Sequence, residues 1–143
     1  MAKKCEKKEA ARRASMWWAN KIANKGVDAG FVKDQMDGIG LNFMKNFKRN
    51  AQPTQIMRFQ TELEERILKL MDERAFVELL VDYHPFAPLS DAAEAAGIDE
   101  MCFPMKTVCR IVPEGGDLYC VWVERQGGGN RRCLEENGAE ADG

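Results

Sequence analysis

The chain of 143 residues has no long apolar stretch, a single histidine and no recognisable secretion signal. A helix that crosses a bilayer requires ~20 mainly apolar residues, and no segment approaches that length, so we expect no membrane partner. The first residues are charged where a signal peptide would be apolar. Five cysteines without such a signal are typical of reduced thiols in a cytoplasm. These absences favour one soluble, cytoplasmic domain.

Motifs for catalysis and for ligand binding are also missing. His84 has no serine or cysteine at a spacing that would make it the partner of a nucleophile. The last four cysteines are separated by six, ten and twelve residues, whereas zinc sites usually contain a C-x₂₋₄-C pair. The glycine-rich segment 126–132 lacks the Gly-Lys-Ser/Thr end of a phosphate-binding loop. We therefore expect no enzymatic activity, no metal and no cofactor, and the alternative that stays open is an enzyme that uses His84 or the cysteines.

The distribution of charge is the most unusual feature that is present. Residues 1–50 hold twelve Lys/Arg and five Asp/Glu, a net charge of +7, and residues 51–143 hold nine and eighteen, a net charge of −9. The total of −2 therefore combines a basic head with an acidic remainder. Such an asymmetry suggests that the basic part meets something anionic.

The basic head, residues 4–50, is predicted to form two helices. Good helix formers fill the segment from about Lys4 to Asn24, and Gly26 is a typical residue just after a helix. Asp28 is a suitable N-cap for a second helix, whose apolar residues lie three or four apart.

A long amphipathic helix is predicted over residues 53–84. Pro53 suits a first helical position, and apolar residues keep the same spacing of three or four as far as Val81. Residues 90–97 are predicted to form a short helix, because a serine precedes an alanine-rich stretch that ends at a glycine.

A β-hairpin is predicted over residues 106–124, where apolar residues alternate with a period of two. A four-residue turn would place Cys109 opposite Cys120, on the same face as Trp122. Both faces of this hairpin contain apolar residues, and a lone two-stranded ribbon is marginal in water. One face should therefore pack on the helices, and the other on a further strand or a second subunit.

These elements predict an α+β fold in one domain, residues 1–125. The domain would consist of an N-terminal bundle of three helices, one of them long, followed by the short helix and the hairpin. Residues 126–143, rich in glycine and acidic residues, are predicted to be a flexible tail.

An aromatic pair, Trp17-Trp18, lies among the cations of the first helix. Neighbouring helical residues point about 100° apart, so both cannot enter one core stripe. Trp18 aligns with the apolar stripe, which leaves Trp17 able to stack on a base while cations meet phosphate. Alternatively, Trp17 covers the helical core or a subunit contact. The candidate residues for binding a nucleic acid or an acidic partner are Arg12, Arg13, Trp17, Lys21, Lys45, Lys48 and Arg49.

Three other interpretations remain open. The acidic part could bind a protein partner, with Glu62, Glu65, Asp72, Glu73 and Trp122 as the candidate residues. The basic head could dock on an acidic side of a second copy and form a homo-oligomer. Residues 89–98 followed by the hairpin could form a winged helix that binds DNA, although Pro104 would interrupt its recognition helix.

The middle third of the chain resembles small uncharacterised proteins of phages and mobile elements in gut bacteria. The segments concerned are Asp82-Tyr83-His84-Pro85, Leu89–Ile98 and Phe103–Thr107, followed by the hairpin. The resemblance implies no activity, but it implies a setting in which short proteins without enzymatic activity bind and disable host machinery, including CRISPR effectors. The sequence thus favours a non-enzymatic binding protein that engages a nucleic acid or nucleoprotein through its basic head. The alternative is an inhibitor that binds a host defence protein.

Overall fold

The computed structural model describes residues 4–35, 51–125, 131–136 and 138–140. It shows an α+β fold, as predicted. The elements in chain order are β1 (Cys5–Glu6), α1 (Lys7–Gln35), α3 (Pro53–Glu73), β2 (Val77–Val81), α4 (Leu89–Ala96), a 3₁₀ turn η1 (Glu100–Cys102), β3 (Thr107–Pro113), β4 (Leu118–Arg125) and β5 (Arg132–Cys133).

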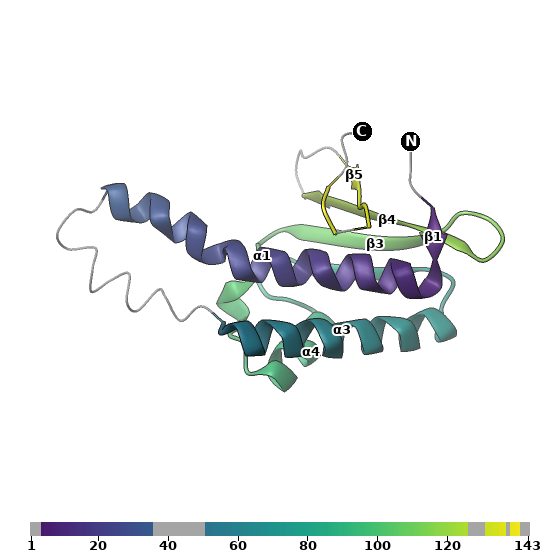
Figure 1. Ribbon diagram of the computed structural model, residues 1–143, viewed down its shortest axis with the longest axis horizontal. Helices are drawn as coiled ribbons and strands as arrows, with labels where there is room; N and C mark the ends of the chain where they lie inside the picture. The colour runs from purple at the N-terminus through teal and green to yellow at the C-terminus, as the bar shows by residue number, and fades with distance from the viewer. Residues whose placement is uncertain (1–3, 36–50, 126–130, 137, 141–143) are drawn as a thin grey trace.

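The strands form one antiparallel sheet in the order β1-β4-β3-β2, and β5 pairs with the same outer edge of β4 as β1 does. Helices α1 and α3 lie side by side, run in opposite directions and cover one face of this sheet (Figure 1). Helix α4 packs against α3. The arrangement is a sheet covered by a helical layer, with α4 on the edge of that layer.

The core lies between the two helices and the sheet. Small residues on α1, such as Ala10 and Ala14, are fully buried and allow the helix to approach its neighbours closely. The large aromatic residues meet at one point, where Phe103 contacts Trp18 and Phe59 with ring centroids 6.1 and 5.6 Å apart. Burial of such rings supplies much of the hydrophobic stabilisation of a small domain.

The first helix is longer than the sequence predicted. Helix α1 continues through Gly26 and Gly30 to Gln35, so the stop at Gly26 and the start of a second helix at Asp28 are both wrong. A glycine inside a helix costs only about 1 kcal/mol relative to alanine, so it does not end a helix by itself. The rest of the predicted second helix, residues 36–50, lies outside the described residues.

The long helix is shorter than predicted, because α3 ends at Glu73 and residues 77–81 form strand β2. Val77 and Val81 are four residues apart, a spacing that fits one helical turn and also two repeats of the two-residue period of a strand. The segment forms a strand because β2 pairs with β3 over its whole length, with Leu79 opposite Cys109. The predicted bundle of three helices is therefore wrong where this segment is concerned.

The short helix and the hairpin are confirmed, but the register of the hairpin is not. Gly97 ends α4 in a left-handed conformation with φ of 72°. Strands β3 and β4 pair Cys109 with Val123, three residues beyond the predicted Cys120. The turn is tighter than expected, because Glu114 donates its N–H to Leu118 at 2.9 Å.

This shift by three residues places each side chain of β4 on the face opposite to the predicted one, because side chains alternate along a strand. Val121 and Val123 join Cys109 against the helices, whereas Cys120 and Trp122 lie on the other face. The further strands expected to cover that second face extend the edges of the sheet instead.

The winged-helix interpretation is also wrong. The position of its recognition helix is occupied by η1, a turn of three residues.

Candidate functional site: a cationic cavity beside Trp17

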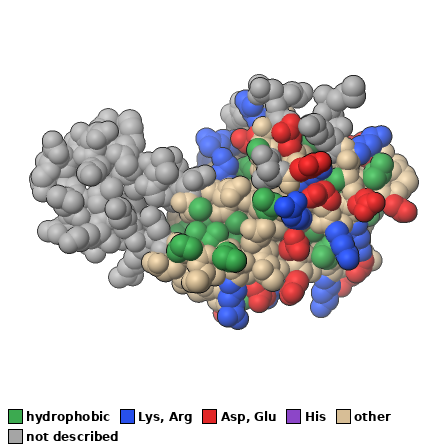
Figure 2. Space-filling model, viewed as in Figure 1, with side chains coloured by type: hydrophobic (Ala, Val, Ile, Leu, Met, Phe, Trp, Pro, Cys, Tyr) green, Lys and Arg blue, Asp and Glu red, His purple; other side chains and the backbone are tan. Residues whose placement is uncertain are grey.

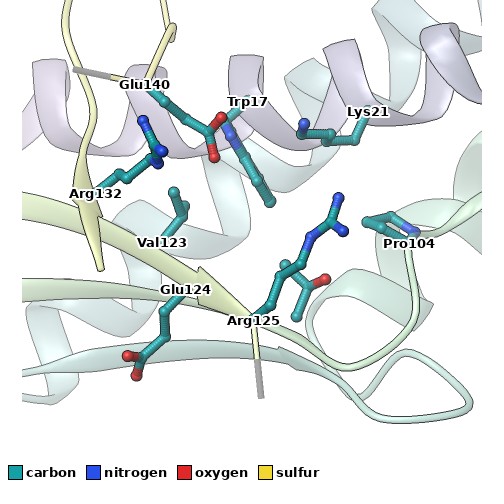
Figure 3. A pocket seen from close by; sticks show the side chains of 9 residues that line it. Trp17, Lys21, Pro104, Val123, Glu124, Arg125, Arg132 and Glu140 are labelled. Carbon is teal, nitrogen blue, oxygen red and sulfur yellow. The ribbon is translucent and has the colours of Figure 1, made fainter. Parts of the chain in front are cut away.

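A cavity of about 440 Å³ opens between α1 and the end of β4. Five parts of the chain form its walls: α1, the loop before β3 together with the start of β3, the end of β4, β5 and the segment after β5 (Figure 3). Its lining consists of Trp17, Lys21, Pro104, Thr107, Val123, Glu124, Arg125, Arg132 and Glu140.

Trp17 forms the wall of the cavity on the side of α1. Its side chain is only 4% exposed, and its ring meets Trp18 edge-on with centroids 4.8 Å apart. The indole Nε1 is buried and has no hydrogen-bond partner among the described residues. In Figure 3 the nitrogen end of the ring is turned toward Glu140. A buried donor without an acceptor costs free energy, which an acceptor inside the cavity would recover.

Three cations come to this cavity from different elements. Lys21 lies one turn after Trp17 on α1, with Nζ 5.3 Å from the centroid of the Trp17 ring. Arg125 is the last residue of β4, and its guanidinium reaches into the same space (Figure 3). Neither of these two takes part in an ion pair among the described residues. Arg132 enters from β5 beside Glu140.

The two acids of the lining differ in direction. Glu140 points into the space between Arg132 and Trp17, whereas the carboxylate of Glu124 is directed away from it (Figure 3). Glu124 instead accepts a hydrogen bond from Arg110, which also bonds to Glu78 at 2.9 Å on the second face of the sheet. The cavity is therefore cationic overall.

The C-terminal segment, residues 131–136 and 138–140, closes one side of the cavity. Leu134 is fully buried and donates its N–H to Val121 at 2.9 Å. Gly138 packs directly on α1, where an added Cβ would lie 3.0 Å from that of Met16 and 3.3 Å from the backbone nitrogen of Trp17. The predicted flexible tail is therefore wrong for these residues.

Two of the cations predicted to bind a partner donate hydrogen bonds to this segment. Arg13 is buried and donates to the carbonyl of Leu134 at 3.3 Å. Arg12 donates to the carboxylate of Glu9 at 3.0 Å and to the carbonyl of Glu136 at 3.3 Å. Arg12 and Arg13 thus bind the chain's own C-terminal segment. Arg13 is buried by these contacts, whereas the side chain of Arg12 stays 51% exposed, so its contact with a partner remains a prediction.

The remaining predicted residues of the basic head divide into two groups. Trp17 and Lys21 are brought together at the cavity, but the burial of Trp17 is incompatible with the predicted stacking on a base and agrees with the alternative that it covers the helical core. Lys45, Lys48 and Arg49 lie outside the described residues. Figure 2 shows Lys and Arg side chains interspersed with Asp and Glu across one face of the molecule.

The acidic candidates are partly engaged within the chain. Glu62 pairs with Arg66 along α3, and Asp72 pairs with Lys7 of α1. Glu65 and Glu73 are exposed on α3. Trp122 lies on the second face of the sheet, where the guanidinium of Arg131 is 4.2 Å from the centroid of its ring.

The five cysteines and the histidine do not meet at one place. Burial raises the pKa of the Cys5 and Cys120 thiols, and Cys133, which lies close to both, adds to this larger effect. Cys109 and Cys120 are buried on opposite faces of the sheet, so the expected contact across the hairpin does not exist. His84 Nδ1 lies 3.2 Å from Glu100 Oε2 at an exposed position. Within the described part of the chain, no group of three or more His, Cys, Asp and Glu could hold a metal ion.

Sequence reasoning missed Arg125, Arg132 and Glu140. Arg125 stands one residue past the end of the predicted hairpin, and the other two lie in the predicted flexible tail. One signal was present: Cys133-Leu134 is an apolar pair within a polar stretch, and a buried anchor of that kind can order a short terminal segment.

No family model, curated protein or solved structure matches the chain. None of the helices in the described ranges has the apolar length that a bilayer span requires.

Proposed function

We propose that this protein is a non-enzymatic binding protein that holds an anionic group of a nucleic acid or nucleoprotein in the cavity beside Trp17. One observation carries the proposal. Lys21 and Arg125, from a helix and a strand, converge on one cavity, and neither has an acidic partner among the described residues. When unpaired Lys and Arg neutralise phosphates, the nucleic acid releases the counter-ions condensed on it, which favours binding.

The chemistry of the lining favours binding over catalysis. Lysine, arginine and an indole N–H are donors that recognise phosphate or carboxylate oxygens. The lining contains no histidine or cysteine, and its one hydroxyl, that of Thr107, already donates to the carbonyl of Met105 at 3.0 Å. No residue of the cavity is thus paired with a base as an activated nucleophile would be.

A salt titration tests the proposal. Short fluorescently labelled single-stranded DNA and RNA are titrated with the protein, and the anisotropy is followed as the salt concentration rises. Two or three phosphate contacts give a slope of log K against log salt of about −1.4 to −2.1 on single strands. The absence of binding at low salt, or a flat response to salt, would contradict the proposal.

Matched variants locate the binding. Lys21→Gln and Arg125→Gln should each weaken the affinity about tenfold, since each removes one charge-assisted contact. Lys69→Gln and Arg58→Gln remove the same charges from exposed positions on α3 that do not line the cavity. If the α3 controls weakened binding as much as the cavity variants, the binding would be a general effect of net charge and the proposed site would be wrong.

The predicted genetic setting, and the inhibitor that binds a defence protein through its acidic face and hairpin, stay predictions. The candidate residues of that second interpretation are Glu62, Glu65, Asp72, Glu73 and Trp122, of which Glu65, Asp72 and Glu73 are exposed.

A further inference from the structure

Building on the proposed function, we infer that the cavity takes the terminal phosphate monoester of a nucleic-acid strand, and not a phosphodiester within the strand. The inference rests on the charge, the shape and the donors of the cavity.

The charge of the cavity matches a dianion. Lys21 and Arg125 contribute two positive charges with no ion-pair partner among the described residues, and the positive charge of Arg132 lies beside the negative charge of Glu140, so that the net charge of these side chains is +2. A phosphate monoester carries about −1.5 to −2 at pH 7, whereas each phosphodiester of a strand carries a single negative charge. The terminal group is therefore the better electrostatic complement.

The shape favours the end of a strand. A volume of about 440 Å³ lies within the range of small-ligand pockets, roughly 300–1,000 Å³. A phosphate within a nucleic-acid strand is bonded to a nucleoside on both sides, while a terminal phosphate is bonded to a nucleoside on one side only. Since five parts of the chain wall this cavity, we expect it to admit an end that only enters more readily than a nucleic-acid strand that must enter and leave.

The hydrogen-bond donors of the cavity surround one space and do not form a row along which a nucleic-acid backbone could lie. The ammonium of Lys21 is beside the Trp17 ring, the guanidinium of Arg125 faces it from β4, and the buried indole N–H is turned toward the carboxylate of Glu140 without bonding to it. Glu140 shows that an anion can lie at this end of the cavity. A terminal phosphate has three strong acceptor oxygens, which suits several donors that meet from different sides.

The test compares oligonucleotides that differ only at their ends. A short single-stranded DNA is prepared with a 5′-phosphate, with a 3′-phosphate, and with hydroxyls at both ends, and each is titrated with the protein at one low salt concentration. At least one phosphorylated form should bind about tenfold more tightly than the hydroxyl form, the size of one additional charge-assisted contact. Inorganic phosphate and a phosphoserine peptide serve as competitors.

Two pairs of variants show whether the cavity makes the distinction. Trp17→Phe should reduce the preference for the phosphorylated end severalfold, while Trp18→Phe, which loses the same N–H at a core position outside the cavity lining, should keep it. Glu140→Gln should increase the affinity for the phosphorylated end, because it removes a like charge. Glu136→Gln removes the same charge from an exposed position outside the lining and should not.

The outcomes separate this inference from the proposed function. Equal binding of phosphorylated and hydroxyl forms, with sensitivity to Lys21→Gln, would overturn the inference and leave the proposed function intact. If no oligonucleotide bound, both would be wrong. A phosphoserine peptide or inorganic phosphate that bound as tightly as the phosphorylated oligonucleotide would overturn the assignment to the end of a nucleic acid.

Discussion

Trp17 and Trp18 are neighbours on α1, and both are buried in different surroundings. Trp18 packs on Phe103 in the core, as its position on the apolar stripe predicted. Trp17 is covered by groups far away in the sequence, including Gly138 against its backbone. Periodicity along one helix identifies the stripe that faces the core, but it contains no information about which distant segment covers the edge of that stripe.

Cys109 should make stability depend on pH above 9. Burial raises the pKa of its thiol from 9.0 to about 12, and the neighbouring Trp18 acts in the opposite direction. The folded state then keeps a proton that the unfolded state loses, so this contribution is complete below pH 9 and is lost as the pH rises toward 12. Between pH 9 and 11 the wild type should lose about 2 kcal/mol more unfolding free energy than Cys109→Ala.

Urea unfolding of both proteins at a series of pH values measures this difference, since lysines and tyrosines titrate alike in the two. An identical pH dependence of the two proteins would contradict the burial of an uncharged thiol at this position.

At the scale of elements, the sequence predicts α4 and both hairpin strands, and it fails where two periods coincide or where a turn sets the register. Val77 and Val81 satisfy a helix and a strand equally, and only the pairing with β3 decides between them. In the hairpin, Gly115 and Gly116 both adopt positive φ values, 102° and 62°. Glycines allow such turns without fixing their length, so the shift of three residues could not be read from the sequence.

The C-terminal segment is the element whose order matters most for the cavity, and Gly138 tests it. Gly138→Ala should lower the unfolding free energy by about 2 kcal/mol, since φ is 73° and the new Cβ would press on α1. Gly116→Ala is the matched control, because φ is 62° and nothing lies within 4 Å. It should cost about 1 kcal/mol from the backbone conformation alone.

Chemical denaturation of the two variants, followed by tryptophan fluorescence, compares these costs. An equal loss of stability in Gly138→Ala and Gly116→Ala would contradict the close packing of the C-terminal segment on α1.

At the scale of the whole molecule, part of the positive charge of the basic head is bound by other parts of the same chain. Lys7 pairs with Asp72 of α3, and Arg12 and Arg13 bind carbonyls of the C-terminal segment. Charge counted along the sequence therefore overstates the charge offered to a partner. Lys21 and Arg125, two cations without an ion pair among the described residues, become a site only because the fold brings α1 and β4 together, and the sequence contains no local signal for that meeting.

The indole N–H resonance of Trp17 gives the most direct test of the central claim, that the cavity beside Trp17 receives the anion. It is assigned through Trp17→Phe in a two-dimensional ¹H–¹⁵N spectrum, and the protein is then titrated with the phosphorylated oligonucleotide. We expect the Trp17 resonance to shift in a saturable manner as its N–H gains an acceptor, while that of Trp18 changes little. Binding that left Trp17 unmoved, or that moved Trp18 or Trp122 instead, would contradict the account.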